Sequence, residues 1–235
     1  MIGLKGVTHF ESSPAGAVPV LIDATFVFPR EPVALLGTDP IVRRSLVDLL
    51  AGLVRPSEGR VQWAGRVSFP IGRYGLFRSH LSGAETVALF ASLYGLDTKK
   101  VIQFTQNFDS LGASMSARTS DWPLAASVKL SLILAVTAPF DIYVVESAVT
   151  LIGETTFNEK WQQLFRRCIE GKTLVLSSIR PQTLETFCSK AVVAENGTLR
   201  LIDDLAHGIA FYPQRQSSPE PERSMVNVEQ DDDSF

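Results

Sequence analysis

The sequence predicts an α/β fold in which a mostly parallel sheet is covered on both faces. Three short apolar runs, 33–36, 142–145 and 173–176, have the composition of strands buried on both sides, and the last two are rich in β-branched residues. Segments with apolar residues at helical intervals lie between and after these runs. Asn196 and Gly197 separate two further apolar runs, which is typical of a two-residue hairpin turn. Buried strands that alternate with helices predict this layered arrangement.

The first part of the chain predicts two strands, a helix and a pair of strands. Residues 18–28 alternate in part between apolar and polar side chains, which indicates a strand. The run 33–36 ends at a glycine, and residues 41–53 then place apolar side chains at helical intervals. After a polar turn, residues 61–63 and 66–69 favour a pair of strands on either side of an Ala-Gly turn.

The rest of the chain predicts helices around the second and third apolar runs. Residues 82–94 carry Ala, Leu and Phe at helical intervals, and Ser82 with Glu85 fits a capping box at their start. Further helices are predicted over residues 101–111, 127–136, 158–168 and 182–188. Residues 191–194 and 199–202 are the expected arms of the hairpin.

Composition predicts one sizeable domain in the cytoplasm. The chain has 235 residues, and 45% of them are hydrophobic. A formal net charge of −3 gives no global basic signal for nucleic acid, so no nucleic-acid partner is expected. The longest apolar stretch, residues 130–140, is shorter than the roughly 18 residues that a membrane span needs. The first ten residues lack the basic-then-apolar pattern of a signal peptide.

Several stretches occur in an order and spacing that resemble one protein family. They are residues 67–72, 81–87, 93–96, 140–146, 157–160 and 184–188. Together they resemble the ATP-binding cassette of ABC transporters, in the branch that exports capsular polysaccharide and O-antigen. The resemblance implies an α/β P-loop NTPase-like (RecA-like) fold, with a mostly parallel sheet, an antiparallel β lobe and a helical subdomain at about 78–138. The cassette would span residues 1–212. Residues 213–235, rich in Gln, Ser, Pro, Glu and Asp, predict a disordered acidic tail.

Residues 37–45 hold the place of the family's phosphate loop, whose pattern is G-x-x-x-x-G-K-[ST]. Gly37 keeps the first glycine, Arg43 replaces the lysine, and Arg44 and Ser45 follow. An intact loop works by pointing several backbone N–H groups at phosphate, in a shape that glycine adopts easily. An arginine keeps the charge of the lysine, but its planar fork has a different shape.

Three residues inside this segment act against phosphate binding. Pro40 has no N–H to offer, Val42 resists positive φ, and Asp39 places a negative charge where phosphate would lie. Two interpretations stay open. The two arginines and the serine could form a weak anion site at a helix N-terminus, or the segment is an ordinary strand-to-helix turn with solvated arginines.

The family's magnesium-binding and water-activating pair falls at Glu146 and Ser147. In the family these positions are aspartate and glutamate. Glu146 can still ligate a hard cation, although it reaches one methylene further. Ser147 cannot accept a proton from water near neutral pH, and loss of a general base costs roughly 10²–10⁴ in rate. The alternative interpretation is a strand end that points at solvent.

The remaining motif positions of the family also carry altered side chains. The signature motif, which in the family grips the γ-phosphate of a partner cassette, falls at Leu124 and Ala125, where apolar side chains favour packing. The switch histidine falls at Ile179, which neither donates nor accepts a hydrogen bond. The Q-loop glutamine falls at Arg78, and the adenine-stacking aromatic falls at Phe10. A core aromatic is the alternative interpretation of Phe10.

These substitutions together predict a pseudo-ATPase, a nucleotide-binding-domain-like subunit of a polysaccharide-export ABC transporter. The resemblance implies a membrane permease as partner, a homo- or heterodimer with another cassette, and a peripheral place on the inner face of the plasma membrane. No catalytic residue and no resident metal are predicted. Two alternatives remain: a soluble regulatory or scaffold protein of polysaccharide export, and a slow ATPase that binds ATP and magnesium weakly.

Overall fold

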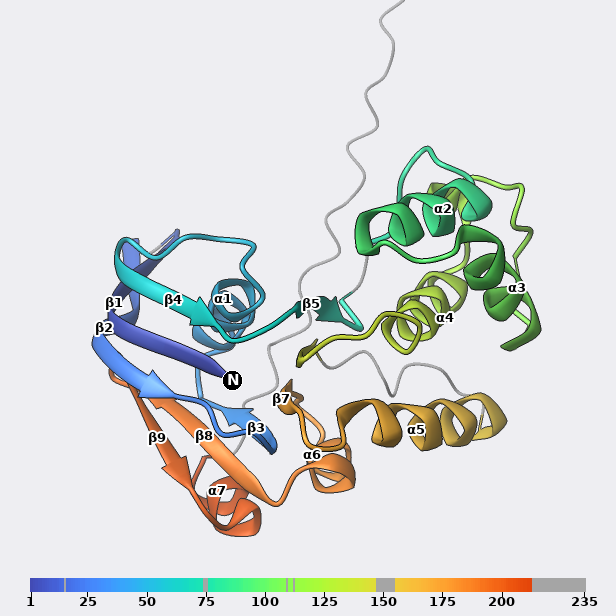
Figure 1. The fold of residues 1–235 in the computed structure, drawn as a ribbon. Coiled ribbons are helices and arrows are strands. Elements are labelled where there is room, and N and C mark those ends of the chain that lie inside the picture. The colour runs from blue at the N-terminus through green and yellow to red at the C-terminus, as the bar shows by residue number, and fades with distance from the viewer. Residues whose placement is uncertain (15, 74–75, 109, 112, 147–154, 213–235) are drawn as a thin grey trace, which may run out of the picture.

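The computed structural model describes residues 1–14, 16–73, 76–108, 110–111, 113–146 and 155–212 (Figure 1). Its strands form two sheets, one of six strands and one of three. Ser147 and the expected tail at 213–235 lie outside the described residues. Among the helices of the described part, none is long and apolar enough to cross a membrane.

The six-stranded sheet has the order β5-β6-β7-β3-β8-β9. All neighbours in it are parallel except β8 and β9, which form the expected hairpin. Asn196 and Gly197 both have positive φ in its turn, as a two-residue hairpin turn of this type requires. The strands are β3 (Pro32–Leu36), β5 (Val67–Ile71), β6 (Ile142–Glu146), β7 (Thr173–Ser177), β8 (Lys190–Glu195) and β9 (Thr198–Ile202).

The second sheet is antiparallel, with the order β2-β1-β4. It contains β1 (Ile2–Ser13), β2 (Gly16–Val27) and β4 (Glu58–Trp63). The prediction that 61–63 and 66–69 pair with each other is wrong, because β4 pairs with β1 while β5 pairs with β6. Gly65, at φ +121°, turns the chain tightly against Asp141, whose side chain accepts a hydrogen bond from the Arg66 N–H at 3.0 Å. That turn carries the chain from one sheet into the other.

Seven helices and one 3₁₀ turn surround the sheets in the described residues. They are α1 (Pro40–Leu50), α2 (Gly83–Tyr94), α3 (Thr98–Phe108), η1 (Thr119–Asp121), α4 (Leu124–Ala135), α5 (Thr155–Ile169), α6 (Pro181–Phe187) and α7 (Leu205–Phe211). α2, α3 and α4 gather at one end of the molecule (Figure 1). The capping box predicted at the start of α2 is present, because the side chains of Ser82 and Glu85 each accept the other's backbone N–H.

The large sheet separates two apolar cores. Along β6, Tyr143 and Val145 belong to the core under α4 and α5, whereas Ile142 and Val144 belong to the core shared with α1 and the antiparallel sheet. Alternate residues of one strand therefore face opposite cores, as a strand buried on both sides requires. This confirms the predicted fold class, with helices on one face and α1 plus a β lobe on the other.

Candidate functional site

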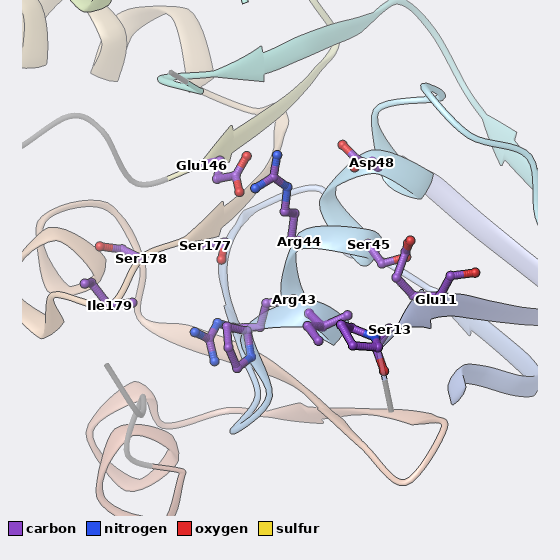
Figure 2. A pocket seen from close by; sticks show the side chains of 14 residues that line it. Glu11, Ser13, Arg43, Arg44, Ser45, Asp48, Glu146, Ser177, Ser178 and Ile179 are labelled. Carbon is purple, nitrogen blue, oxygen red and sulfur yellow. The ribbon is translucent and has the colours of Figure 1, made fainter. Parts of the chain in front are cut away.

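A cavity of about 670 Å³ opens at the carboxyl edge of the parallel strands (Figure 2). Its walls come from the end of β1, the start of α1, and the residues at the ends of β6 and β7. The crevice beyond the carboxyl ends of parallel strands is where open α/β sheets bind their ligands. Of the predicted site residues, Arg43, Arg44, Ser45, Glu146 and Ile179 line this cavity.

The start of α1 is hydrogen-bonded to its own N-cap. Asp39 has extended backbone, and its carboxylate accepts the N–H of Ile41 at 2.7 Å. Pro40 fills the first helical position, and the N–H of Arg43 donates to the Asp39 carbonyl at 3.1 Å. No residue from 37 to 45, a stretch that the structure describes throughout, has positive φ. The N–H groups of Ile41 and Arg43 are therefore bonded to oxygens of Asp39.

Arg43 is buried rather than solvated. Its side chain folds back to donate to the Gly37 carbonyl, and only 5% of the residue is exposed. Burial lowers the pKa of Arg43, while the attraction of Asp39 raises it. The solvated-arginine interpretation is therefore wrong for Arg43, whose guanidinium takes part in the turn itself. Arg44 is exposed and lines the cavity (Figure 2).

Ser45 faces the cavity with a hydroxyl that has no hydrogen-bond partner among the described residues. Only 2% of this residue is exposed. A buried hydroxyl left without a partner costs free energy. The Ser45 oxygen beside the start of α1 is therefore available to bind a ligand.

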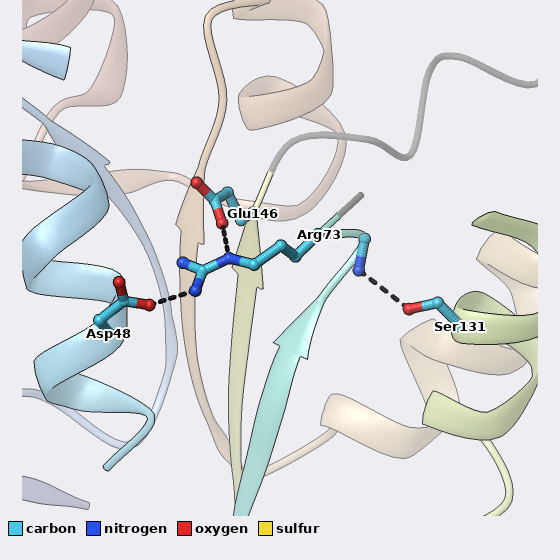
Figure 3. Close-up of polar contacts among 5 residues, drawn as sticks. Asp48, Arg73, Ser131 and Glu146 are labelled. Carbon is cyan, nitrogen blue, oxygen red and sulfur yellow. Dashed lines mark hydrogen bonds and ion pairs between the residues drawn. The ribbon is translucent and has the colours of Figure 1, made fainter. Parts of the chain in front are cut away.

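Glu146 takes part in one of two ion pairs that share Arg73, which were not predicted from the sequence (Figure 3). Arg73, two residues beyond β5, bonds the Glu146 carboxylate through Nε and the Asp48 carboxylate through Nη1. The interpretation of Glu146 as a strand end pointing at solvent is wrong, because its side chain is only 25% exposed and is paired. The signal was present: Arg73 follows a buried strand whose carboxyl end shares the sheet edge with that of β6.

Arg78 makes a structural contact instead of lining the cavity. Its guanidinium donates to the carbonyl oxygens of Ser120 and Trp122, just before α4. Leu124 and Ala125 follow at the first positions of α4, where no side chain caps the helix. Leu124 is 44% exposed, so within the described part of the chain this position is not packed into a core.

Phe10 is on β1 and is 47% exposed, so its interpretation as a core aromatic is wrong. The cavity wall at this strand is formed by Glu11, Ser12 and Ser13 instead of Phe10. Ile179 lines the cavity and is 43% exposed. Where the resemblance places the switch histidine, the wall is therefore apolar.

The described residues do not fit a magnesium-bound triphosphate. At the helix start that would receive phosphate, the Ile41 N–H donates to the Asp39 carboxylate. Arg43, which replaces the loop lysine, donates to the Gly37 carbonyl. The carboxylate that would hold magnesium bonds Arg73. These three groups therefore have partners within the chain, whereas Arg44 is exposed and the Ser45 hydroxyl has no partner among the described residues.

No protein-family model matches the chain. The chain is 25% identical over 218 residues to the ATP-binding protein BexA of Haemophilus influenzae, covering 92% of this chain and 100% of the relative. It is 27% identical over 220 residues to the polysialic acid transport ATP-binding protein KpsT of Escherichia coli, covering 92% and 98%. It is 28% identical over 188 residues to the O-antigen export system ATP-binding protein RfbB of Klebsiella pneumoniae, covering 78% and 76%.

Solved structures show the same fold. The ATP-binding subunit of an ABC transporter superposes with a TM-score of 0.72 at 18% identity, covering 93% of this chain and 95% of that one. The cassette MJ0796, a dimer bound to ADP and Pi, gives a TM-score of 0.64 at 15% identity, covering 87% and 99%. The fold is that of an ABC ATPase cassette. Within that class, homologues of the chain are named as ATP-binding proteins of capsule polysaccharide export, polysialic acid transport and O-antigen export, which confirms the resemblance found in the sequence.

Proposed function

We propose that the chain is a cassette-like subunit of a polysaccharide-export ABC transporter that does not hydrolyse ATP. The names of its relatives support the transporter assignment. The relatives give no sign of inactivity, so the loss of hydrolysis is argued from this chain's own residues. The altered motif positions and the contacts around the cavity carry that part of the proposal.

The self-capped start of α1 is the observation that carries the loss of hydrolysis. A helix N-terminus binds an anion through free N–H groups and the helix dipole. Here the Asp39 carboxylate already takes the N–H of Ile41, and Pro40 has no N–H. A phosphate at this place would have to displace a carboxylate of the same charge. The serine at position 147, which the sequence places where the family has its general base, removes a second requirement of the reaction.

The proposed partners are a membrane permease and a second cassette, at the inner face of the plasma membrane. In a head-to-tail pair, the site built on this chain's α1 start would lack a phosphate loop. The opposite site would have the partner's loop facing Leu124, an exposed apolar side chain on an uncapped helix. Neither composite site would then be complete, whether the partner is another copy or a competent cassette.

Steady-state phosphate release by the full chain with ATP and magnesium tests the proposal. We expect no magnesium-dependent turnover, because neither phosphate nor an attacking water is positioned. The KpsT relative, purified and assayed in parallel, serves as the positive control. Turnover of about 1 s⁻¹ or more, within the ordinary enzyme range, would refute the proposal.

Weak ATP binding without rapid hydrolysis is a second candidate function. The cavity volume, the exposed Arg44 and the unpartnered Ser45 hydroxyl favour it. Calorimetry with ATP, in the presence and absence of magnesium, tests this candidate. Heat of binding that disappears in Arg44→Gln supports it, and the absence of binding heat excludes it.

A further inference from the structure

Arg73 joins three separate elements through two residues that line the cavity, Asp48 and Glu146 (Figure 3). It follows β5, its Nη1 bonds Asp48 of α1, and its Nε bonds Glu146 at the end of β6. The three side chains are 14%, 21% and 25% exposed in the order Arg73, Asp48, Glu146. The guanidinium is therefore a partly buried cation between two partly buried carboxylates.

The oxygens around this guanidinium are those that a hard divalent cation selects. Magnesium and manganese take carboxylate and hydroxyl oxygens and keep several waters. Asp48 and Glu146 supply carboxylates, and Ser45 lines the same cavity with a buried hydroxyl that has no partner in the described part of the chain. This hydroxyl is a further oxygen in the same cavity, and neither ion pair of Arg73 uses it.

The charges explain why a cation has to be present at this place. Two carboxylates held together away from water repel each other, and a cation between them removes that cost. Although burial lowers the pKa of Arg73, its hydrogen bonds with Glu146 and Asp48 raise that pKa above the ordinary value. Its planar fork also bonds two acceptors at once, which a lysine cannot do in the same geometry.

We propose that Arg73 takes the place of a divalent cation, so that the site between Asp48 and Glu146 is permanently filled by the chain's own guanidinium. The inference rests on these side chains and Ser45, and it holds whether or not the chain assembles with a transporter. The unmodified protein then binds neither magnesium nor manganese here. Removal of the guanidinium charge turns the same oxygens into a divalent-cation site.

Manganese binding to the full chain, followed by electron paramagnetic resonance and calorimetry, tests the inference. We expect one manganese site in Arg73→Gln, with an affinity at least about tenfold greater than that of any manganese binding to the unmodified protein. The double variant Arg73→Gln/Glu146→Gln loses the gained site. Lys172→Gln is the matched control, because it removes the cation of the partly buried pair with Asp141 but leaves a single carboxylate there.

Each outcome decides the inference. A manganese ion that binds the unmodified protein and is lost in Glu146→Gln would overturn it, as would a folded Arg73→Gln variant that binds no manganese. If Arg73→Gln fails to fold, recovery of its circular dichroism by millimolar manganese supports the inference, and failure to recover overturns it. None of these results depends on ATP turnover, so they test the inference independently of the proposed function.

Discussion

At the scale of a single residue, Asp39 sets the hydrogen bonding at the start of α1. The sequence places a negative charge where phosphate would lie, and the structure adds that this carboxylate caps the helix through the Ile41 N–H. A helix cap and a phosphate compete for the same donors, because the first N–H groups of a helix have no intrahelical partner. The residue that caps α1 therefore also competes with any anion for the Ile41 N–H.

Replacing Asp39 measures this cap. We expect Asp39→Ala to lower the free energy of unfolding by about 1 kcal/mol, the usual cost of losing an N-cap side chain. Asp39→Asn keeps an acceptor at the cap and should stay close to the unmodified protein. Urea denaturation of the three proteins gives the comparison. Equal midpoints for Asp39→Ala and the unmodified chain would contradict the capping role.

Which residues lie near this site was partly predictable from the sequence, but the directions of their side chains were not. The position of Arg43 follows from the spacing of the loop, yet its fold-back onto the Gly37 carbonyl depends on burial of the turn. Arg73 was missed because an arginine after a strand has no motif of its own. Its partners, Asp48 and Glu146, are 25 and 73 residues away in the chain. Only the shared sheet edge brings them together.

Helix α2 shows how an element can be predicted closely. Its apolar spacing and the Ser82–Glu85 pair gave both its extent and its start, because the capping box is a local interaction between residues three apart. By contrast, β1 was not predicted. Its pairings shift register at several points and it includes Gly3 and Gly6, so its burial pattern departs from strict alternation. The predicted pairing of β4 with β5 was wrong for a different reason: strand pairing depends on residues that are far apart in the sequence.

The capping box should make the stability of the chain depend on pH. Hydrogen bonds from the backbone and side chain of Ser82 hold the pKa of Glu85 below its ordinary value of 4.5. A lowered folded-state pKa means that the charged form is stabilising above 4.5 and that this contribution is lost as pH falls through the folded pKa. The unfolding midpoint of Glu85→Gln should therefore lie below that of the unmodified protein near neutral pH.

The two midpoints are expected to converge at a pH well below 4.5, where Glu85 of the unmodified chain is protonated. Exposed Glu159 on α5, replaced in the same way, provides the control for a general effect of surface charge. A constant difference between Glu85→Gln and the unmodified protein across the whole pH range would argue against the charged capping box.

At the scale of the whole molecule, α5 is tied to the helical end through Trp161. Only 1% of this residue is exposed, its ring stacks on Phe165 with centroids 4.5 Å apart, and its Nε1 donates to the Leu132 carbonyl of α4 at 2.7 Å. The core around it was predictable as apolar from the sequence. The division of the chain into a helical subdomain at about 78–138 and a tail after 212 stays a prediction.

Trp161→Ala should lower the free energy of unfolding by about 3–5 kcal/mol, as expected for an aromatic side chain removed from a core. Trp161→Phe keeps most of the volume and loses the hydrogen bond to Leu132, so its loss should be smaller. Chemical denaturation followed by circular dichroism measures both. A loss below about 1 kcal/mol for Trp161→Ala would mean that the core closes around the gap.

The Arg73 bridge has a consequence for how the protein responds to its surroundings. A dissolved ion strengthens a fold by mass action, so its effect rises and falls with the ion's concentration. A guanidinium fixed to the backbone obeys no such equilibrium: it cannot be diluted, exchanged or stripped by a chelator. The contribution of the Arg73 contacts among α1, β5 and β6 to the stability of the fold should thus be the same at low and at high magnesium concentration in the cell.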